Sequence, residues 1–413
     1  MRLCAIALLT CLMLACSDAG WAQPVFSAEG QDTAAYGAAA GYPGAPRGVR
    51  PTQGTMIGTF SGFDRIYPHR VVDRPKEPSP LRYAPAGFDV EYRFRGEART
   101  IQAYLDRHPV TGLLIAQDDT ILLEQYRYAR RDTDRFVSQS MVKTLTGMLV
   151  GIAVSEGAIR SIDDLAAAYV PGLAGLAYGQ TSIRDLLHMA SGVAFLETYD
   201  GNDDSARLSR GLFPAKSPGP EAVLAQFNHR EVPPGTRFHY AGAETEVLGL
   251  VVAHATGITL TRYLQARIWQ PLGAEADASW TIDGTGHEVA YCCFNAVLRD
   301  WARIGLMLAH DGAWNGHRIV PRQWVLDATT VAAPYLAPGT ATRFAGYGYQ
   351  LWLLPGPRRQ FALLGIHGQA IYIDPAARLV MVHAAARVKP SADPAIAETL
   401  ALWRGVVAHV AGP

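Results

Sequence analysis

The chain has 413 residues, enough for a large hydrophobic core and for more than one substructure. Lysine plus arginine and aspartate plus glutamate each total 37, so the formal net charge is zero, and no basic field predicts nucleic-acid binding. Hydrophobic residues make up 49% and charged residues 18% of the chain, a composition that excludes a disordered protein and is typical of a packed globular one.

The amino-terminal segment, residues 1–22, has the features of a secretory signal peptide. A single arginine precedes an apolar run at residues 4–15, which is too short to span a bilayer comfortably, and Gly20-Trp21-Ala22 fits a small-x-small cleavage site. Residues 13–16 form a partial lipoprotein box, so a lipid anchor on Cys16 is the alternative. The rest of the chain has no apolar run of spanning length. We therefore expect an exported protein, periplasmic or secreted.

Residues 23–87 are rich in glycine, proline and alanine, which is typical of an extended segment with few helices or strands. We predict an amino-terminal arm here, with the apolar run at residues 55–60 packed against the body of the protein. Residues 88–413 then form the main domain.

The main domain begins with a predicted helix near residue 99 and two alternating strands around a turn at residues 118–120, which indicate a hairpin. A long apolar helix follows and ends at Gly157. Mostly helical sequence comes next, and strands return between residues 347 and 385 before a final helix. Strands at both ends with helices between them predict an α/β plus all-α fold, in which an antiparallel sheet flanked by helices carries an inserted helical subdomain at roughly residues 158–290.

The first candidate site is the pair Ser140 and Lys143 at the start of the long helix. Residues three apart share one face of a helix, and a lysine there can help to remove the proton that makes a serine hydroxyl a poor nucleophile. Unpaired backbone N–H groups at a helix start also favour negative charge. Serine is common at helix starts for capping reasons alone, so the pair by itself leaves both readings open. The chain has only four lysines, however, and only Lys143 has a serine at this spacing.

Two further segments gain weight only together with this pair. Tyr240 stands between a Pro-Pro-Gly turn and a predicted helix, where a lone tyrosine is more simply a core anchor. His367-Gly368 interrupts an apolar strand, and a glycine inside a strand marks either the close approach of a ligand or a bulge.

Two cysteines remain beyond the predicted signal peptide, the neighbours Cys292 and Cys293. A bond between adjacent residues requires strained geometry and closes no useful loop, so we expect two buried thiols rather than a disulfide. No paired CxxC spacing predicts a zinc site.

Taken together, the order and spacing of the three segments resemble the serine β-lactamase and penicillin-binding-protein superfamily, whose signatures are S-x-x-K, then Y-x-N or S-x-N, then K-T-G on an edge strand. The chain is most similar to the class C-type branch, with family VIII esterases and 6-aminohexanoate-dimer hydrolases. The resemblance runs from about residue 99 to the carboxyl end and includes "SIDDLAAAYVPG", "TSIRDLLHMASGV" and "PPGTRFHYAGAETEVLG". These joint matches are specific to the superfamily and weakly specific to the substrate.

The resemblance implies a serine hydrolase that cleaves an ester or amide bond through an acyl-enzyme. In this reading Ser140 is the nucleophile, Lys143 its helical partner, and Tyr240 the general base, kept as a phenolate by the lysine. The chemistry needs no metal and no organic cofactor. The implied partner is a small-molecule ester or amide, and the sequence predicts no oligomeric state.

For substrate binding, the resemblance places His367-Gly368 at the third motif and the oxyanion hole at the backbone N–H groups of Ser140 and Gln369. Tyr199 resembles a tyrosine that 6-aminohexanoate-dimer hydrolases hold over the substrate amide.

Two departures from the family pattern bear on the substrate. Gly242 stands where Y-x-N has its asparagine, so no side-chain amide is present there, and His367 replaces the lysine of the third motif with a group that is at most partly charged at neutral pH. Both weaken the recognition of a β-lactam carboxylate. We therefore favour a carboxylesterase or an amidase acting on short ω-amino oligomers. The alternatives are a D-amino-acid peptidase, a β-lactamase, or a non-catalytic penicillin-recognising or peptidoglycan-binding domain.

Overall fold

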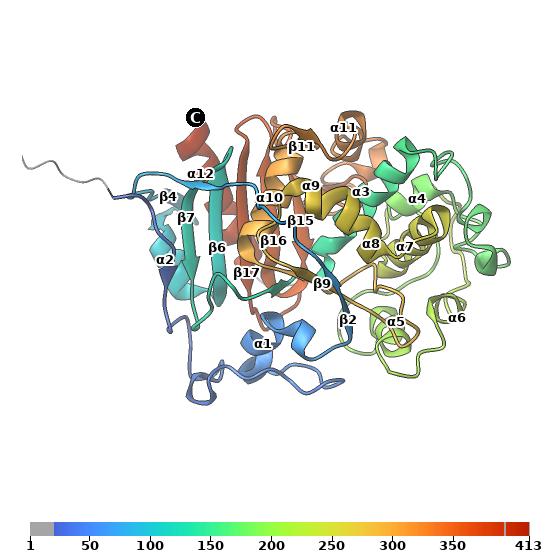
Figure 1. Cartoon of the computed structure of the whole chain (residues 1–413), viewed down its shortest axis with the longest axis horizontal. Coiled ribbons are helices and arrows are strands. Elements are labelled where there is room, and N and C mark those ends of the chain that lie inside the picture. The colour runs from blue at the N-terminus through green and yellow to red at the C-terminus, as the bar shows by residue number, and fades with distance from the viewer. Residues whose placement is uncertain (1–19, 392–393, 413) are drawn as a thin grey trace, which may run out of the picture.

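The computed structural model describes residues 20–391 and 394–412, and its centre is a large sheet covered by helices (Figure 1). The first nineteen residues of the predicted signal peptide, with Cys16, lie outside the described residues. The sheet has nine strands in the order β1-β7-β6-β17-β16-β15-β14-β13, with β3 also paired to β7. The strands are β1 (Val25–Phe26), β3 (Arg82–Tyr83), β6 (Val110–Gln117), β7 (Thr120–Tyr126), β13 (Gly346–Tyr347), β14 (Trp352–Leu353), β15 (Phe361–Gly365), β16 (Gln369–Asp374) and β17 (Leu379–Ala385).

The sheet is antiparallel from β7 through to β13, as predicted, and only the two short strands β1 and β3 run parallel to β7. Its central strands are apolar along almost their whole length because both faces are covered. Ile371 of β16 faces the core that includes α10 (Leu298–Ala309). Its neighbours Tyr372 and Met381 point to the opposite face, against α12 (Ala395–Ala411).

On one side of the sheet, α3 (Val142–Ser155) separates the strands from a helical layer. Nearly every residue of α3 is buried, because it packs against α7 (Gly242–Thr256) as well as the core of the sheet. The other helices of this layer lie within the predicted inserted stretch: α4 (Ile183–Leu187), α5 (Asp204–Leu212), α6 (Pro220–Leu224), α8 (Leu260–Leu264) and α9 (Gln270–Leu272).

The amino-terminal arm contains more regular structure than its composition predicted. Helix α1 (Gln53–Phe60) packs its apolar residues inward, which confirms the predicted burial of residues 55–60. Strand β2 (His69–Val72) then joins a second sheet in the order β2-β9-β10-β8. Its other strands are β8 (Phe136–Val137), β9 (Ala278–Thr281) and β10 (Phe294–Ala296). The arm is therefore built into the molecule rather than laid over it.

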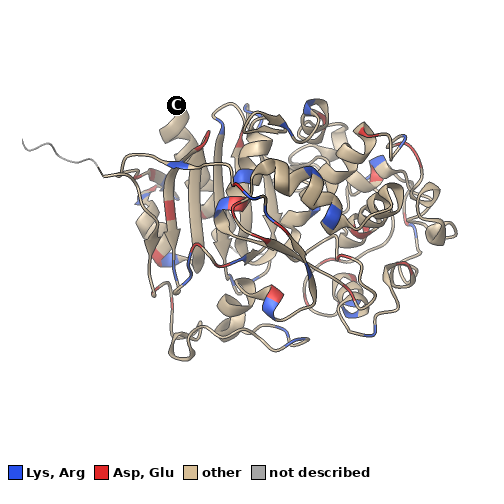
Figure 2. Cartoon of the chain, viewed as in Figure 1, with Lys and Arg blue, Asp and Glu red and all other residues tan. Residues whose placement is uncertain are grey.

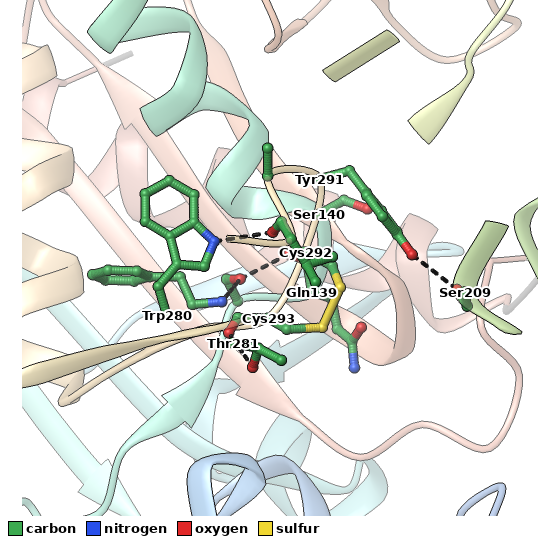
Figure 3. The surroundings of a disulfide bond; sticks show 12 residues. Gln139, Ser140, Ser209, Trp280, Thr281, Tyr291, Cys292 and Cys293 are labelled. Atoms are coloured by element: carbon green, nitrogen blue, oxygen red, sulfur yellow. Dashed lines mark hydrogen bonds between the residues drawn. A yellow bond between two sulfur atoms is a disulfide. The ribbon is translucent and has the colours of Figure 1, made fainter. Parts of the chain in front are cut away.

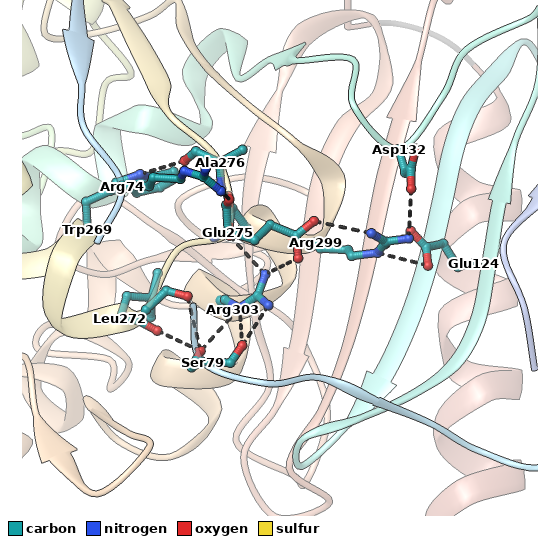
Figure 4. A network of polar contacts seen from close by, with 12 residues as sticks. Arg74, Ser79, Glu124, Asp132, Trp269, Leu272, Glu275, Ala276, Arg299 and Arg303 are labelled. Carbon is teal, nitrogen blue, oxygen red and sulfur yellow. Dashed lines mark hydrogen bonds and ion pairs between the residues drawn. The ribbon is translucent and has the colours of Figure 1, made fainter. Parts of the chain in front are cut away.

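Residues of both charge signs are interspersed along the ribbon in Figure 2, in keeping with the zero net charge. A network of polar contacts lies around α10 (Figure 4). Arg299 forms ion pairs with Glu124 of β7 and with Glu275, and Arg303 binds Glu275 and the backbone carbonyl of Ser79 in the arm. These bonds fix α10 against both the sheet and the arm.

The remaining elements are short and lie at the periphery. They are α2 (Ile101–Arg107), α11 (Arg322–Ala328), the ribbon of β4 (Glu91–Phe94) and β5 (Glu97–Thr100), and the ribbon of β11 (Ala313–Trp314) and β12 (His317–Arg318). In the described part of the chain no single helix has the length and apolarity to cross a membrane. Only the bent pair Gly242–Thr256 and Leu260–Leu272 passes such a test together, and most of it is buried in the core.

Candidate active site

The predicted nucleophile lies in a sharp turn between β8 and α3. Ser140 is the central residue of a 3₁₀ turn, η3 (Gln139–Met141), whose first residue has a positive φ of 46°. Ser138, at the start of the turn, is fixed to Phe294 of β10 by two bonds: its N–H donates to the Phe294 carbonyl and its hydroxyl accepts from the Phe294 N–H. The neighbouring sheet therefore sets the position of the turn.

Lys143, one turn into the helical segment, is brought directly to Ser140. Its side chain is 1% exposed, and Nζ donates to Ser140 Oγ at 3.1 Å and to the backbone carbonyl of Tyr291 at 2.8 Å. Burial lowers the pKa of Lys143 to about 8, against the opposing influence of the Glu197 and Glu246 carboxylates. A lysine with such a pKa is partly unprotonated at neutral pH and can accept a proton.

Tyr240 completes a group of three. Nζ of Lys143 lies 5.2 Å from the centre of the Tyr240 ring, which also stacks on Trp352 at 5.4 Å. Burial raises the pKa of Tyr240, as does the nearby Glu197 carboxylate, and a hydrogen bond with Ser140 opposes them. The tyrosine is therefore a neutral phenol at pH 7, which differs from the phenolate expected from the resemblance. Lys143 is the member of the group that titrates near neutrality.

Glu197 is a site residue that the sequence analysis missed. Its carboxylate accepts from the Tyr199 hydroxyl at 2.7 Å and from the Gly242 N–H, the first of helix α7, at 2.6 Å. A Cβ on Gly242 would lie 3.4 Å from that carboxylate and 3.2 Å from the Tyr291 ring. Glu197 therefore fills the space beside the residue that replaces the family asparagine. Glu197 belongs to no periodic pattern or motif. The one feature of the sequence that could have indicated it is the absence of a side chain at Gly242, which leaves room for another group.

Tyr199 lies in the pocket wall, as the resemblance implied, but its hydroxyl is already bonded to Glu197. Its backbone adopts a positive φ of 61°, and its N–H donates to Asp203 Oδ2 at 2.6 Å. The turn that carries it is therefore well fixed.

The third predicted segment reaches the site through its backbone. A Cβ on Gly365, the last residue of β15, would lie 2.5 Å from the Ser138 carbonyl and 2.9 Å from Gln139, so the strand passes directly against the nucleophile turn. Gln369 begins β16 opposite Gly365, and its side chain is buried and donates to the Ala385 carbonyl. The backbone between Gly365 and Gln369 is thus the part of this segment that faces Ser140.

His367 is not brought to the pocket as a substrate-binding side chain. Its ring packs on Phe60 of the arm at 5.1 Å, and its Nδ1 lies 2.7 Å from the Arg387 carbonyl. Burial lowers its pKa, so the imidazole is neutral at pH 7. Its neighbours Ile366 and Gly368 line the pocket instead. The side chain that replaces the family lysine is turned away because its φ of 63° reverses the chain between them.

The pocket has a volume of about 350 Å³ and holds Ser140, Tyr240 and Glu197 in its wall. Most of the remaining wall is apolar, formed by Phe344, Trp352, Leu364, Ile366, Ala370 and Ile396. Among the described residues, no group of three or more histidine, cysteine, aspartate or glutamate side chains is arranged to hold a metal ion.

The expectation of two free thiols at Cys292 and Cys293 was wrong: the two form a disulfide (Figure 3). Both are buried, and they follow Tyr291, whose carbonyl holds Lys143 and whose hydroxyl lies 2.9 Å from Ser209 Oγ. The chain reverses here, with a positive φ of 71° at Cys293, and that turn brings the two sulfur atoms together. The disulfide therefore lies directly after the residue whose carbonyl contacts the proposed base.

This combination of a sheet between helices, an inserted helical layer and a Ser-Lys-Tyr group at their junction defines a serine hydrolase of the β-lactamase and penicillin-binding-protein class. The family model described as Beta-lactamase matches residues 98–402, and the chain belongs to that family. It is 28% identical over 290 residues to a 6-aminohexanoate-dimer hydrolase of Paenarthrobacter ureafaciens, covering 68% of this chain and 74% of that one.

Solved structures are similar in fold. A putative 6-aminohexanoate-dimer hydrolase from Bacillus anthracis superposes with a TM-score of 0.77 at 24% identity, covering 86% of this chain and 94% of that one. A D-stereospecific amidohydrolase from Streptomyces sp. superposes with a TM-score of 0.52 at 17% identity, covering 74% and 95%.

Proposed function

We propose that this protein hydrolyses small esters or amides through an acyl-enzyme on Ser140. The observation that carries the proposal is that Ser140 and Tyr240 line one pocket and that buried Lys143 contacts both of them. A serine needs an adjacent base to become a nucleophile, and Lys143 lies within hydrogen-bonding distance with a pKa lowered to about 8.

In the proposed mechanism, unprotonated Lys143 takes the proton from Ser140 as Oγ attacks the substrate carbonyl. The neutral Tyr240 hydroxyl, bonded to the same oxygen, passes a proton to the leaving amine or alcohol. Water then attacks the acyl-enzyme and gives a proton to the Tyr240 phenolate. The Lys143 ammonium returns its proton to Ser140 Oγ as the bond between that oxygen and the acyl group breaks, which releases the acid and restores both groups. The carbonyl of Tyr291 keeps Lys143 aimed at the nucleophile throughout.

The negative charge of the tetrahedral intermediate requires fixed donors. We propose the Ser140 N–H as one and a backbone N–H between Gly365 and Gln369 as the other, because this segment packs against the nucleophile turn. Gln369 was the donor implied by the resemblance, and its side-chain bonds to β17 fix its position.

Glu197 bears on the choice of substrate. A carboxylate beside Tyr240 repels an anion and attracts an N–H donor or an amine. This favours an amidase for short ω-amino oligomers, like the named activity of the Paenarthrobacter relative, together with general esterase activity. A D-amino-acid peptidase or a β-lactamase is the alternative within enzymes, and a non-catalytic binding domain is the alternative outside them.

A hydrolysis panel on the purified protein tests the proposal. It contains short-chain nitrophenyl esters, a 6-aminohexanoate dimer, a D-Ala-D-Ala peptide and a chromogenic cephalosporin. We expect an ester or the dimer to exceed the cephalosporin in kcat/KM by at least about a hundredfold, since β-lactam recognition loses charged and amide contacts. Ser140→Ala should remove at least about a thousandfold of activity. Labelling of another serine by a fluorophosphonate probe would contradict the assignment.

A further inference from the structure

The pocket that holds Ser140 continues past Gly368 to a buried arginine that the proposed reaction does not use. Arg387 follows β17, is 4% exposed, and forms part of the pocket wall together with Thr399 of α12. A Cβ on Gly368 would lie 3.1 Å from Arg387 Nε. The absence of a side chain at Gly368 therefore leaves this guanidinium uncovered on the pocket side.

The guanidinium is only partly bonded. Nη2 donates to the Tyr104 hydroxyl at 3.1 Å and to the Thr399 hydroxyl, whereas Nε is buried without any hydrogen-bond partner. Burial raises the pKa of Tyr104, so this partner is a neutral phenol. Buried charges in proteins are normally paired and fully hydrogen bonded, because an isolated one is costly.

Among the described residues, the acid nearest to Arg387 in the sequence does not neutralise it. Glu398 precedes Thr399 in α12, but its carboxylate serves a separate cluster. The groups that bind it are Tyr92, Arg99, Arg107 and His108. No ion pair between described residues includes Arg387.

Two further titratable groups, Tyr372 and His383, line this end of the pocket. Burial raises the pKa of Tyr372, so it is a neutral phenol. His383 lies closer to the arginine's partners. Burial lowers its pKa to about 3, and the Arg387 charge acts in the same direction, so the imidazole is neutral at pH 7. Its ring nitrogens lie 2.9 Å from the Tyr104 hydroxyl and 2.7 Å from the Gly368 carbonyl. The Arg387 end of the pocket is thus polar, and no acid among the described residues forms an ion pair with its guanidinium.

We propose that Arg387 is an anion subsite that receives a carboxylate carried by the substrate, at a distance from the carbonyl that Ser140 attacks. A guanidinium matches a carboxylate through two parallel hydrogen bonds. The wall between the two ends is apolar and includes Leu364, Ile366 and Ile396, which suits a methylene chain. The inference rests on the proposed acyl transfer at Ser140 and narrows its substrates to esters or amides in which an alkyl chain links the reactive carbonyl to a carboxylate.

Turnover of matched substrate pairs tests the subsite. One pair is nitrophenyl hexanoate and the mono-nitrophenyl ester of adipate, extended to the monoesters of butanedioate through octanedioate. The second pair carries the carboxylate on the amine side, as in N-acyl-6-aminohexanoate compared with N-acyl-hexylamine. Wild-type enzyme should favour the carboxylate-bearing member of at least one pair. Arg387→Met should reduce that member's kcat/KM by about ten- to a hundredfold while leaving the neutral member close to wild type.

Lys389→Met is the matched control, because Lys389 is an exposed cation two residues away. It should keep the carboxylate preference, and Arg387→Lys should keep only part of it, since it retains the charge without the fork. Absence of any preference in both pairs, or a preference that survives Arg387→Met, would overturn the subsite. An equal loss of the carboxylate preference in Arg387→Met and in Lys389→Met would also overturn the subsite. It would indicate a general electrostatic attraction rather than a specific contact with Arg387.

A binding measurement separates this inference from the catalytic proposal. Adipate alone should raise the Tm of Ser140→Ala, which cannot form an acyl-enzyme, and should not raise the Tm of the Ser140→Ala, Arg387→Met double variant. Without ligand, Arg387→Met should be at least as stable as wild type, because it removes an uncompensated buried charge. A marked loss of stability, or equal stabilisation of both proteins by adipate, would show that Arg387 has a structural role only.

Discussion

The proposed site contains three side chains that can exchange protons, and their burial determines which of them titrates near neutral pH. Ser140, Lys143 and Tyr240 were all predicted from spacing and resemblance, since each belongs to a short motif. Their protonation was not, because it depends on burial and on Glu197, which no motif marks. Burial lowers the pKa of Lys143 to about 8 and raises that of Tyr240, so the lysine is the base that we propose at neutral pH.

Glu197→Gln tests this distribution of protons. The Glu197 carboxylate raises the pKa of Lys143, so its removal should lower that pKa and increase the unprotonated fraction at a given pH. The acid limb of the kcat/KM profile, expected near pH 8 in the wild type, should move to lower pH in the variant.

Tyr199→Phe serves as the control, because it removes the Tyr199–Glu197 hydrogen bond and leaves the charge in place. Its acid limb should stay near that of the wild type. A limb that does not move in Glu197→Gln would show that the titrating group is not Lys143.

At the scale of elements, the approach of β15 to the nucleophile turn depends on Gly365. Gly365→Ala should push the strand away from Ser138 and Gln139, because its Cβ would lie under 3 Å from both. We expect kcat to fall by up to about a hundredfold with a smaller change in KM, since misplaced backbone donors act on the transition state. Gly175→Ala, where nothing lies within 4 Å, should leave kcat unchanged. An unaffected kcat in Gly365→Ala would remove this strand from the oxyanion hole.

The turn at Tyr291, Cys292 and Cys293 is the second element in contact with a proposed catalytic group, Lys143. A double variant, Cys292→Ser with Cys293→Ser, should remain folded but hold the Tyr291 carbonyl less firmly against Lys143. We expect a lower kcat and an altered pH limb, measured beside wild-type enzyme treated with a dithiol. Identical profiles for the double variant and the oxidised wild type would show that the disulfide does not position the lysine.

Two expectations from the sequence, free thiols at Cys292 and Cys293 and a substrate contact at His367, were wrong for a common physical reason. The rule that neighbouring cysteines stay reduced considers only the dipeptide, whereas the surrounding turn brings Cys292 and Cys293 together. In the same way, the resemblance to the third family motif assigned His367 to the substrate, but its positive φ turns the ring towards Phe60. Both outcomes are set by backbone turns that residue types alone do not predict.

For the whole molecule, the order of strands and helices predicted the central sheet and its helical layer, because alternation and apolar runs mark long buried elements. The structure of the arm was not predicted, since β2 is short and its partner β9 is about two hundred residues away. Long-range pairs of short strands leave little periodicity in either segment.

Export is the prediction that concerns the full chain. Cleavage of the predicted signal peptide should leave Gln23 as the amino terminus, measured by mass spectrometry of protein recovered from the producing cells. The described structure pairs the Ala22 N–H with the Ala84 carbonyl, and cleavage at this point removes that bond while β1 stays in place. A mature chain that begins at a diacylglycerol-bearing Cys16 would indicate a lipoprotein, and an intact Met1 would contradict export.

The pairing of β2 with β9 also limits how early the protein can complete its folding. The arm is synthesised first, but its partner strand β9 is synthesised much later. His69 of the arm pairs with Thr281, and most of the chain has been made by then. Contacts so distant in sequence form slowly, since the entropy of closing a long loop is lost before the contact stabilises anything. The arm is therefore expected to stay unpaired until β9 has been made. Docking of the arm is expected among the last events of folding, and it places Phe60 against the His367 ring, beside the pocket.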